Sequence, residues 1–405
     1  MMRKKIRLPF IVWVVVISTI IACIGGKGIL GYRIAGLGWF IPLVVSLLIL
    51  AKKPGGMKFP VLIWLPWICI VIIYLSVATD VPNALQRSII LLCPIIVGMA
   101  VSQYSITEQA FQSFKKLYHY LAIALLIVVG FKSGLLITGA LPKTAGLAAE
   151  VMTGALLCSL YASRYALGEK KAMIWWGALA AIPVIALTRM GIAAAGVTLP
   201  LTFAPLKRFK RVFIIILIGV IELGVFYMPR TQEKMFYSGQ GTLAELRMDN
   251  PNFATTGRKV MWDMMKPEIK EEPLFGHGAN ADENFVFRST GIMGQPHNDW
   301  MRLLYDYGYI GTIIFGFCIA LQFFHALKRA KRTTGETRIL FYAGASSFLA
   351  FVLFMFSDNI ILYAAFFGNL QFTILGLAYA ALKNSISPEG GASFERRRPR
   401  IKIRF

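Results

Sequence analysis

The sequence predicts an all-α integral membrane protein with about 12 transmembrane helices and one large outward-facing loop that contains amphipathic helices. Hydrophobic residues make up 57% of the 405 residues and charged residues only 16%, whereas an average soluble domain has roughly 25% charged residues. The mean hydropathy of +0.62 agrees with this composition. Apolar runs long enough to cross a bilayer recur along the chain. Together these observations exclude a soluble globular, a disordered and a collagen-like protein.

About twelve segments are apolar over the length of a transmembrane helix. Their approximate limits are 8–24, 34–51, 59–78, 84–101, 117–131, 146–162, 172–188, 190–206, 212–228, 309–328, 338–357 and 360–382. The start of the chain, MMRKKIR before an apolar run, resembles a signal peptide. Because so many further spans follow, we expect an uncleaved first helix.

The orientation in the membrane follows from the loops. Lys and Arg concentrate in alternate short loops, on the side that holds the N-terminus and the tail RRRPRIKIR. Such loops stay in the cytoplasm, so we expect both termini there. The formal net charge of +23 follows from the same bias. It predicts contact with anionic membrane lipids and gives no reason to expect a nucleic-acid partner.

We expect four parts in the chain, of which one is a long loop. Residues 229–308 form a long outward-facing stretch, and loops of that length are usually functional or disordered. Its aromatic residues and amphipathic segments argue against disorder. We therefore expect transmembrane helices one to nine in 1–228, a catalytic loop in 229–308, helices ten to twelve in 309–382 and a basic cytoplasmic tail in 383–405.

The first helix expected in the long loop begins near Arg258. Thr256 is a plausible N-cap, and Arg258 falls in the first turn. The apolar residues that follow share one face, and amphipathic helices beside a membrane commonly lie in the interface plane. These residues are Val260, Met261, Met264, Met265 and Ile269.

A second helix is expected after His297. Asn298 or Asp299 can cap it, and apolar residues recur at helical spacing through Ile310. His297 therefore lies at a helix N-terminus, where the partial positive charge favours anions and disfavours an imidazolium. A neutral imidazole at such a place is a suitable general base for a sugar hydroxyl.

Arg189 lies in a tight outer turn between the seventh and eighth spans. An arginine at that depth is costly unless it faces water, a partner or a ligand. Arg189, Arg258 and His297 are thus expected at one membrane face. Guanidinium groups bind phosphate oxygens in a bidentate manner, so the two arginines predict a phosphate-binding site.

Three more ionisable residues could serve the same site or the fold. Arg302, one turn after Asn298, could add to the phosphate site or pair with Asp299 or Asp306. Arg87 and Glu150 fall at similar depth inside spans, where ionisable groups suggest function. We expect them to form an intramembrane ion pair, the alternative being that they line a donor cavity.

No metal site and no disulfide framework are expected. All five cysteines fall in apolar runs, which is typical of buried small residues. The adjacent acids Asp282 and Glu283 lack a His or Asp at ligand-like spacing. We expect no cofactor.

These motifs carry a resemblance to a known family. The string PHNDWMRLLYDYGYIG, preceded by GR…W…PLFGHG in the loop and by TRMG at a span junction, resembles the bacterial O-antigen ligase and polymerase superfamily. The resemblance implies an inner-membrane glycosyltransferase with a periplasmic site that takes a glycan from undecaprenyl diphosphate without metal. It also implies that Arg189 and Arg258 hold the diphosphate and that His297 activates the acceptor hydroxyl. Thr188 stands where a serine is common in this family.

Several functions share this chemistry. A ligase transfers the glycan to the lipid A core, whereas a polymerase extends a growing glycan on its lipid carrier. The other outer loops are short, which favours a ligase over an O-antigen or exopolysaccharide polymerase. A protein-glycosylating transferase would differ only in its acceptor. A twelve-span secondary transporter is the alternative outside the class, but the two halves of the chain show no repeat.

Overall fold

The structure is a computed structural model that describes residues 8–25, 34–52, 56–140, 146–202, 208–247, 250–254, 257–291 and 295–382. The regular secondary structure of these residues is helical, with one isolated β-bridge between Phe236 and Phe253. This confirms the predicted all-α class. The predicted tail 383–405 and the expected N-cap Thr256 lie outside the described residues.

Ten helices precede the long loop in the described part of the chain. They are α1 (Phe10–Ile24), α2 (Ile34–Lys52), α3 (Leu65–Tyr74), α4 (Val81–Ser102), α5 (Glu108–Ile137), α6 (Ala148–Ala166), α7 (Ala172–Ile185), α8 (Arg189–Gly196), α9 (Leu199–Thr202) and α10 (Arg208–Phe226). Short 3-10 turns, Val61–Ile63 and Leu75–Val77, flank α3. Each of the first nine predicted spans contains at least one of these helices.

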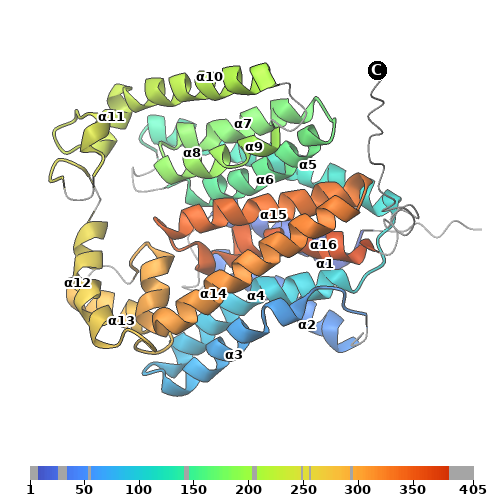
Figure 1. The fold of residues 1–405 in the computed structure, drawn as a ribbon, viewed down its shortest axis with the longest axis horizontal. Helices are drawn as coiled ribbons and strands as arrows, with labels where there is room; N and C mark the ends of the chain where they lie inside the picture. Colours follow the sequence, from blue (N-terminus) through green and yellow to red (C-terminus); the bar gives the residue numbers. More distant parts are fainter. Residues whose placement is uncertain are drawn as a thin grey trace, which may run out of the picture.

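The second part of the chain adds the loop helices and the last spans. The loop contains α11 (Pro229–Met235), the 3-10 turn Leu243–Glu245, α12 (Arg258–Glu271) and α13 (Ala281–Thr290). It is followed by α14 (Asp299–Arg332), α15 (Gly335–Met355), the 3-10 turn Ile360–Leu362, a π-helical turn Ala364–Gly368 and α16 (Asn369–Ala380). Figure 1 shows α11, α12 and α13 at one end of the helix bundle, beside the start of α14.

The centre of the bundle is formed by α6 and α16. Every residue from Glu150 to Arg164 of α6 is buried, and so is all of α16. Close approach needs small residues: a Cβ on Gly376 would lie 2.8 Å from the carbonyl oxygen of Gly98 on α4. Such small-residue contacts are a common way for membrane helices to pack without a hydrophobic driving force.

Several helices can cross a membrane by length and composition. Among the described residues these are α4, α5, α14 and α15, and shorter apolar helical segments are Phe10–Ile24, Gly38–Lys52, Leu65–Val77, Ala172–Ile185 and Ala364–Ala380. The protein is therefore a membrane protein. The number of spans and the side on which each loop lies remain predictions.

A break in α14 positions the loop against the bundle. Gly308 has a φ of 60° and a ψ of −168° inside this helix, which leaves nearby backbone groups without helical partners. Residues 273–278 supply them: Tyr309 N donates to Pro273 O at 2.8 Å, and His277 N donates to Tyr305 O at 2.8 Å. A Cβ on Gly276 would lie 2.6 Å from Gly308 N. The two glycines therefore let the PLFGHG segment dock directly on the break.

The apolar face of α12 packs on protein. Met261, Met265 and Ile269 are buried in one cluster with Val286 of α13 and Tyr305 of α14. Val260, which the sequence assigns to the same face, is 61% exposed. The sequence predicts that the apolar face of α12 lies in the membrane interface. For the part of this face that contains Met265 the prediction is wrong, because α13 and α14 already cover it.

Candidate functional site

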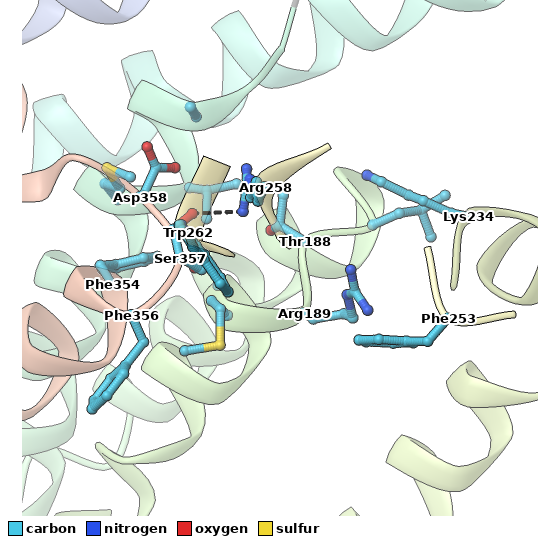
Figure 2. A pocket seen from close by; sticks show the side chains of 16 residues that line it. Thr188, Arg189, Lys234, Phe253, Arg258, Trp262, Phe354, Phe356, Ser357 and Asp358 are labelled. Atoms are coloured by element: carbon cyan, nitrogen blue, oxygen red, sulfur yellow. Dashed lines mark hydrogen bonds between the residues drawn. The ribbon is translucent and has the colours of Figure 1, made fainter. Parts of the chain in front are cut away.

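Three cationic side chains line one cavity of about 380 Å³ at the loop end of the bundle. They are Arg189 of α8, Lys234 of α11 and Arg258 of α12. Figure 2 shows these cations with Phe253, and on the opposite wall Phe354 in the last turn of α15 with Phe356, Ser357 and Asp358 after it. The structure thus brings together the two arginines that the sequence predicts.

Arg189 is placed by a strained turn. Leu187 has a φ of 51°, a left-handed conformation that is unusual for a bulky residue. It turns the chain from α7 into α8, whose first residue is Arg189. The guanidinium lies over the ring of Phe253, with Cζ 4.7 Å from the centroid, and Nη2 donates to Ala254 O at 3.3 Å.

Arg258 is the first residue of α12, after the left-handed Gly257. Its Nη1 donates to the carbonyl oxygen of Ser357 at 2.6 Å. This contact joins α12 to the loop after α15. A guanidinium has five N–H donors, so several remain for a ligand in the cavity.

Lys234 completes the cationic cluster. Its Nζ donates to Ala186 O at 3.2 Å. Burial lowers the pKa of Lys234, and the charges of Arg189 and Arg258 lower it further. Burial and then the charge of Arg258 likewise lower the pKa of Arg189. None of the three cations forms an ion pair with a carboxylate in the part of the chain that the structure describes, so a bound anion would relieve their mutual repulsion.

His297 lies two residues before the start of α14 and contacts Asp358, which lines the cationic cavity. Its Nδ1 is 3.7 Å from Asp358 Oδ1 and 3.0 Å from Asn359 Nδ2. The His297 side chain is 32% exposed. The predicted cap is Asn298, which accepts from Met301 N at 3.1 Å, and this part of the prediction is confirmed.

Two hydrogen bonds fix the turn that carries His297. Trp262 Nε1 of α12 donates to Pro296 O at 2.8 Å. The carboxylate of Asp299 is fully buried and accepts from Ile361 N at 3.0 Å. The first bond holds the turn to α12, and the second holds it to the segment that follows Asp358.

Backbone strain collects at this site. Among the described residues the left-handed non-glycine positions are Leu187, Asn280 and His297. Leu187 lines the cationic cavity, Asn280 lines a second cavity, and His297 contacts Asp358 of the first cavity and Asn359, which is hydrogen-bonded to Gln295 of the second. Strained residues persist where the surrounding structure determines them and are frequent at functional sites.

Arg302 does not reach the cationic cavity. It is buried on α14, where Nε donates to Asp282 Oδ2 at 2.8 Å and Nη1 donates to Asp299 Oδ1 at 3.2 Å. The diphosphate-binding assignment of Arg302 is therefore corrected, because its charge is already neutralised inside the protein. The alternative, a pair with Asp299, is the arrangement that the structure has.

Arg87 and Glu150 do not pair with each other. Arg87 of α4 forms an ion pair with Glu283 of α13. Glu150 is buried on α6 and accepts from Lys132 of α5 at 2.5 Å. The expected mutual pair is wrong, because each residue has a closer partner of opposite charge on another element.

Lys234, Asp358 and Asn359 were not among the site residues predicted from the sequence. Lys234 lies in a short helix without a distinctive motif. Asp358 and Asn359 belong to the polar triplet Ser357-Asp358-Asn359 between the last two apolar runs. A carboxylate in a short outer loop was the signal that could have identified this wall.

The cationic cavity can bind an anion with two or more charges, and His297, which does not line that cavity, is linked to it through Asp358. Among the described residues, no group of three His, Cys, Asp or Glu side chains is arranged to hold a metal ion. The available groups are three cations for a polyanion, one carboxylate and one accessible imidazole. Such a set suits the departure of a phosphate-type leaving group together with proton transfer.

The class of protein follows from the helices, the site and one family match. Residues 172–316 match the model of the O-antigen ligase family, and this segment contains Arg189, Lys234, Arg258 and His297. The match confirms, over these residues, the resemblance to the O-antigen ligase and polymerase superfamily of membrane glycosyltransferases.

A curated protein of Haemophilus influenzae, described as an uncharacterized protein, is similar to part of the chain. It is 23% identical over 160 residues, which cover 36% of this chain and 40% of that relative. The chain thus spans less than half the length of the relative.

Proposed function

We propose that the protein is an inverting, metal-independent glycosyltransferase that moves a glycan from undecaprenyl diphosphate to an acceptor sugar hydroxyl at the periplasmic face of the inner membrane. The favoured activity is that of an O-antigen ligase, with the lipid A core as acceptor. The observation that carries the proposal is the cavity lined by Arg189, Lys234 and Arg258. Its lining also includes Asp358, which contacts His297.

The cations suit the leaving group. A diphosphate departs with its negative charge increased, and preorganised cations stabilise that charge most when water is partly excluded. Arg189 and Lys234 keep an exposed side, and partial burial together with the charges of neighbouring cations lowers the pKa of each. The apolar side chains of Val151, Phe354 and Phe356 also line the cavity, which suits the adjoining prenyl chain.

His297 suits the role of general base. The acceptor oxygen forms a bond to the anomeric carbon from the face opposite the diphosphate, and the bond from that carbon to the diphosphate oxygen breaks. The hydroxyl proton passes to His297 Nε2, and undecaprenyl diphosphate leaves. One displacement inverts the anomeric centre.

Asp358 supports this role through Nδ1. A carboxylate beside Nδ1 favours the tautomer with a proton on that nitrogen and leaves the lone pair on Nε2, and it stabilises the imidazolium that forms. The Asn359 amide serves the same tautomer when it makes a half-turn that presents its Oδ1 to Nδ1, and the Gln295 amide then turns with it to keep their hydrogen bond.

The membrane arrangement is part of the proposal. Residues 229–308 would form the periplasmic catalytic loop, between transmembrane segments in 1–228 and in 309–382. Both termini would be cytoplasmic, with the basic tail near anionic lipid. The cavity lined by Arg258 would then open at the outer face, where a lipid-linked glycan is presented.

Gene disruption followed by gel analysis of surface polysaccharide tests the proposed activity. A ligase predicts lipid A core without any O-chain, with polymer retained on the carrier lipid. Core with a single repeat unit would instead indicate an O-antigen polymerase. Unchanged lipopolysaccharide with lost capsule would indicate an exopolysaccharide polymerase, and unchanged surface glycans would contradict the whole proposal.

A further inference from the structure

A second cavity, of about 450 Å³, is lined in part by Gln295, two residues before His297. Its lining is rich in side-chain amides and aromatic rings and comes from α2, α4, α13 and the segment before α14. The residues that matter here are Trp39, Asn83, Gln86, Asn284, Phe287 and Gln295.

The charges of this cavity are balanced. Arg87 and Glu283 both line it and form an ion pair with each other. The cationic cavity, in contrast, has three cations and only the carboxylate of Asp358. A diphosphate is therefore favoured in the first cavity, whereas the second suits an uncharged ligand.

The chemistry of the lining matches a sugar ring. A side-chain amide both donates and accepts hydrogen bonds, as a sugar hydroxyl does, and an aromatic ring offers a flat apolar face to the C–H groups of a pyranose. Within the described part of the chain the side chains of Gln86 and Asn284 make no hydrogen bond, so their amides are available for a ligand.

Hydrogen bonds to Asp306 of α14 hold the start of α13, which forms one wall of this cavity. The buried carboxylate of Asp306 on α14 accepts from Asn280 N at 3.1 Å and from Asp282 N at 2.8 Å. These two bonds fix the first turn of α13, which carries Glu283 and Asn284. Preorganised groups lose less entropy when a ligand binds.

The cavity is joined to His297 by one amide. Asn359 Nδ2 lies 2.8 Å from Gln295 Oε1, on the lining, and 3.0 Å from His297 Nδ1. Asp358, whose Oδ1 lies 3.7 Å from the same ring nitrogen, lines the cationic cavity. His297 Nδ1 is thus linked through Asp358 to a site for a polyanion, and through Asn359 and Gln295 to a site for an uncharged, hydroxyl-rich ligand.

We propose that the second cavity binds the terminal sugar ring of the acceptor and presents its hydroxyl to His297. This inference rests on the proposed function. In an inverting displacement the acceptor approaches from the side opposite the diphosphate, so it needs a site apart from the cationic cavity, and the two cavities share no lining residue. The residues assigned to acceptor binding are Gln86 and Asn284, with Trp39 and Phe287 as ring contacts.

The test uses the full-length protein in lipid nanodiscs with the double variant Gln86→Ala and Asn284→Ala. Gln112→Ala is the matched control, because Gln112 is an exposed amide on α5 whose bond to Glu108 lies elsewhere. Binding of two soluble probes, a delipidated core oligosaccharide and a free repeat-unit oligosaccharide, is measured by saturation-transfer NMR. The KM values of acceptor and donor are measured in parallel.

We expect the double variant to weaken binding of one of these probes about tenfold and to raise the acceptor KM by a similar factor, since each lost hydrogen bond contributes about fivefold or less. The donor KM and binding of undecaprenyl diphosphate should stay within about twofold. Unchanged oligosaccharide binding, or a rise in the donor KM alone, would overturn the assignment. If the wild type bound a probe through these amides but transferred no glycan, the sugar site would stand and the proposed function would fail.

Discussion

Replacing Asp358 by asparagine removes the carboxylate beside His297 Nδ1 and keeps almost the same shape. The carboxylate oxygen lies 3.7 Å from Nδ1. Two opposite charges at about that distance attract by about 4 kcal/mol at an effective dielectric constant of about 20 and by about 1 kcal/mol in water. Because both side chains are partly exposed, at 32% and 21%, the lower part of this range applies.

A loss of about 1–2 kcal/mol in stabilisation of the imidazolium corresponds to a decrease in kcat of about fivefold to thirtyfold. The donor KM should fall as well, or stay constant. Asp358 is the carboxylate that faces three cations in the cavity, and its removal makes the site more attractive to a diphosphate. A variant that merely damaged the fold would not lower kcat and the donor KM together.

The assay is glycan transfer by purified protein in liposomes, with donor and acceptor varied separately. Asp263→Asn is a matched control, because Asp263 is an exposed acid on α12 that pairs with Lys266, and it should leave both constants within about twofold. A wild-type kcat for Asp358→Asn would refute the role of the carboxylate. So would a decrease in kcat accompanied by a large increase in the donor KM.

Three further predictions concern the cationic cavity. Arg258→Lys should reduce kcat/KM for the donor by about tenfold or more, since a lysine cannot donate to Ser357 O and bind a phosphate in bidentate manner at once; equal efficiency would show that only the charge matters. Lys234→Met should raise the melting temperature of the donor-free protein and weaken donor binding. The pKa of Lys234 is lowered, so Lys234 loses its proton at a lower pH than an exposed lysine does. The donor affinity of the wild type should therefore fall as pH rises through this pKa. The Lys234→Met variant should lack that part of the pH dependence. Incubation with EDTA should leave transfer unchanged, and loss of activity restored by a divalent ion would contradict a metal-independent reaction.

The positions of the helices could be predicted because apolar runs and caps are local signals. The run after Asn298 and its cap are examples. The gathering of Arg189 and Arg258 in one cavity could be predicted from two local features, a short turn between two apolar runs and a helix start in the long loop. Each of the two arginines is the first residue of its helix and lines the cavity, and the start of each helix is a local signal.

The partners of buried charges could not be predicted in this way. Arg87 pairs with Glu283, which is far away in the sequence, and similar depth in the membrane gave no information on which helices are neighbours. Arg302 pairs with Asp282 because α13 docks on α14. The contributions of Lys234 and Asp358 likewise depend on how distant segments meet at the end of the bundle.

The central claim is that His297 acts as the base while the cations hold the diphosphate. The most direct test is transfer by His297→Ala in liposomes, with binding of undecaprenyl diphosphate measured on the same preparation. We predict that transfer falls by about 10²-fold or more, whereas binding stays within about twofold of wild type. Transfer at the wild-type rate, with folded and inserted protein, would contradict the account.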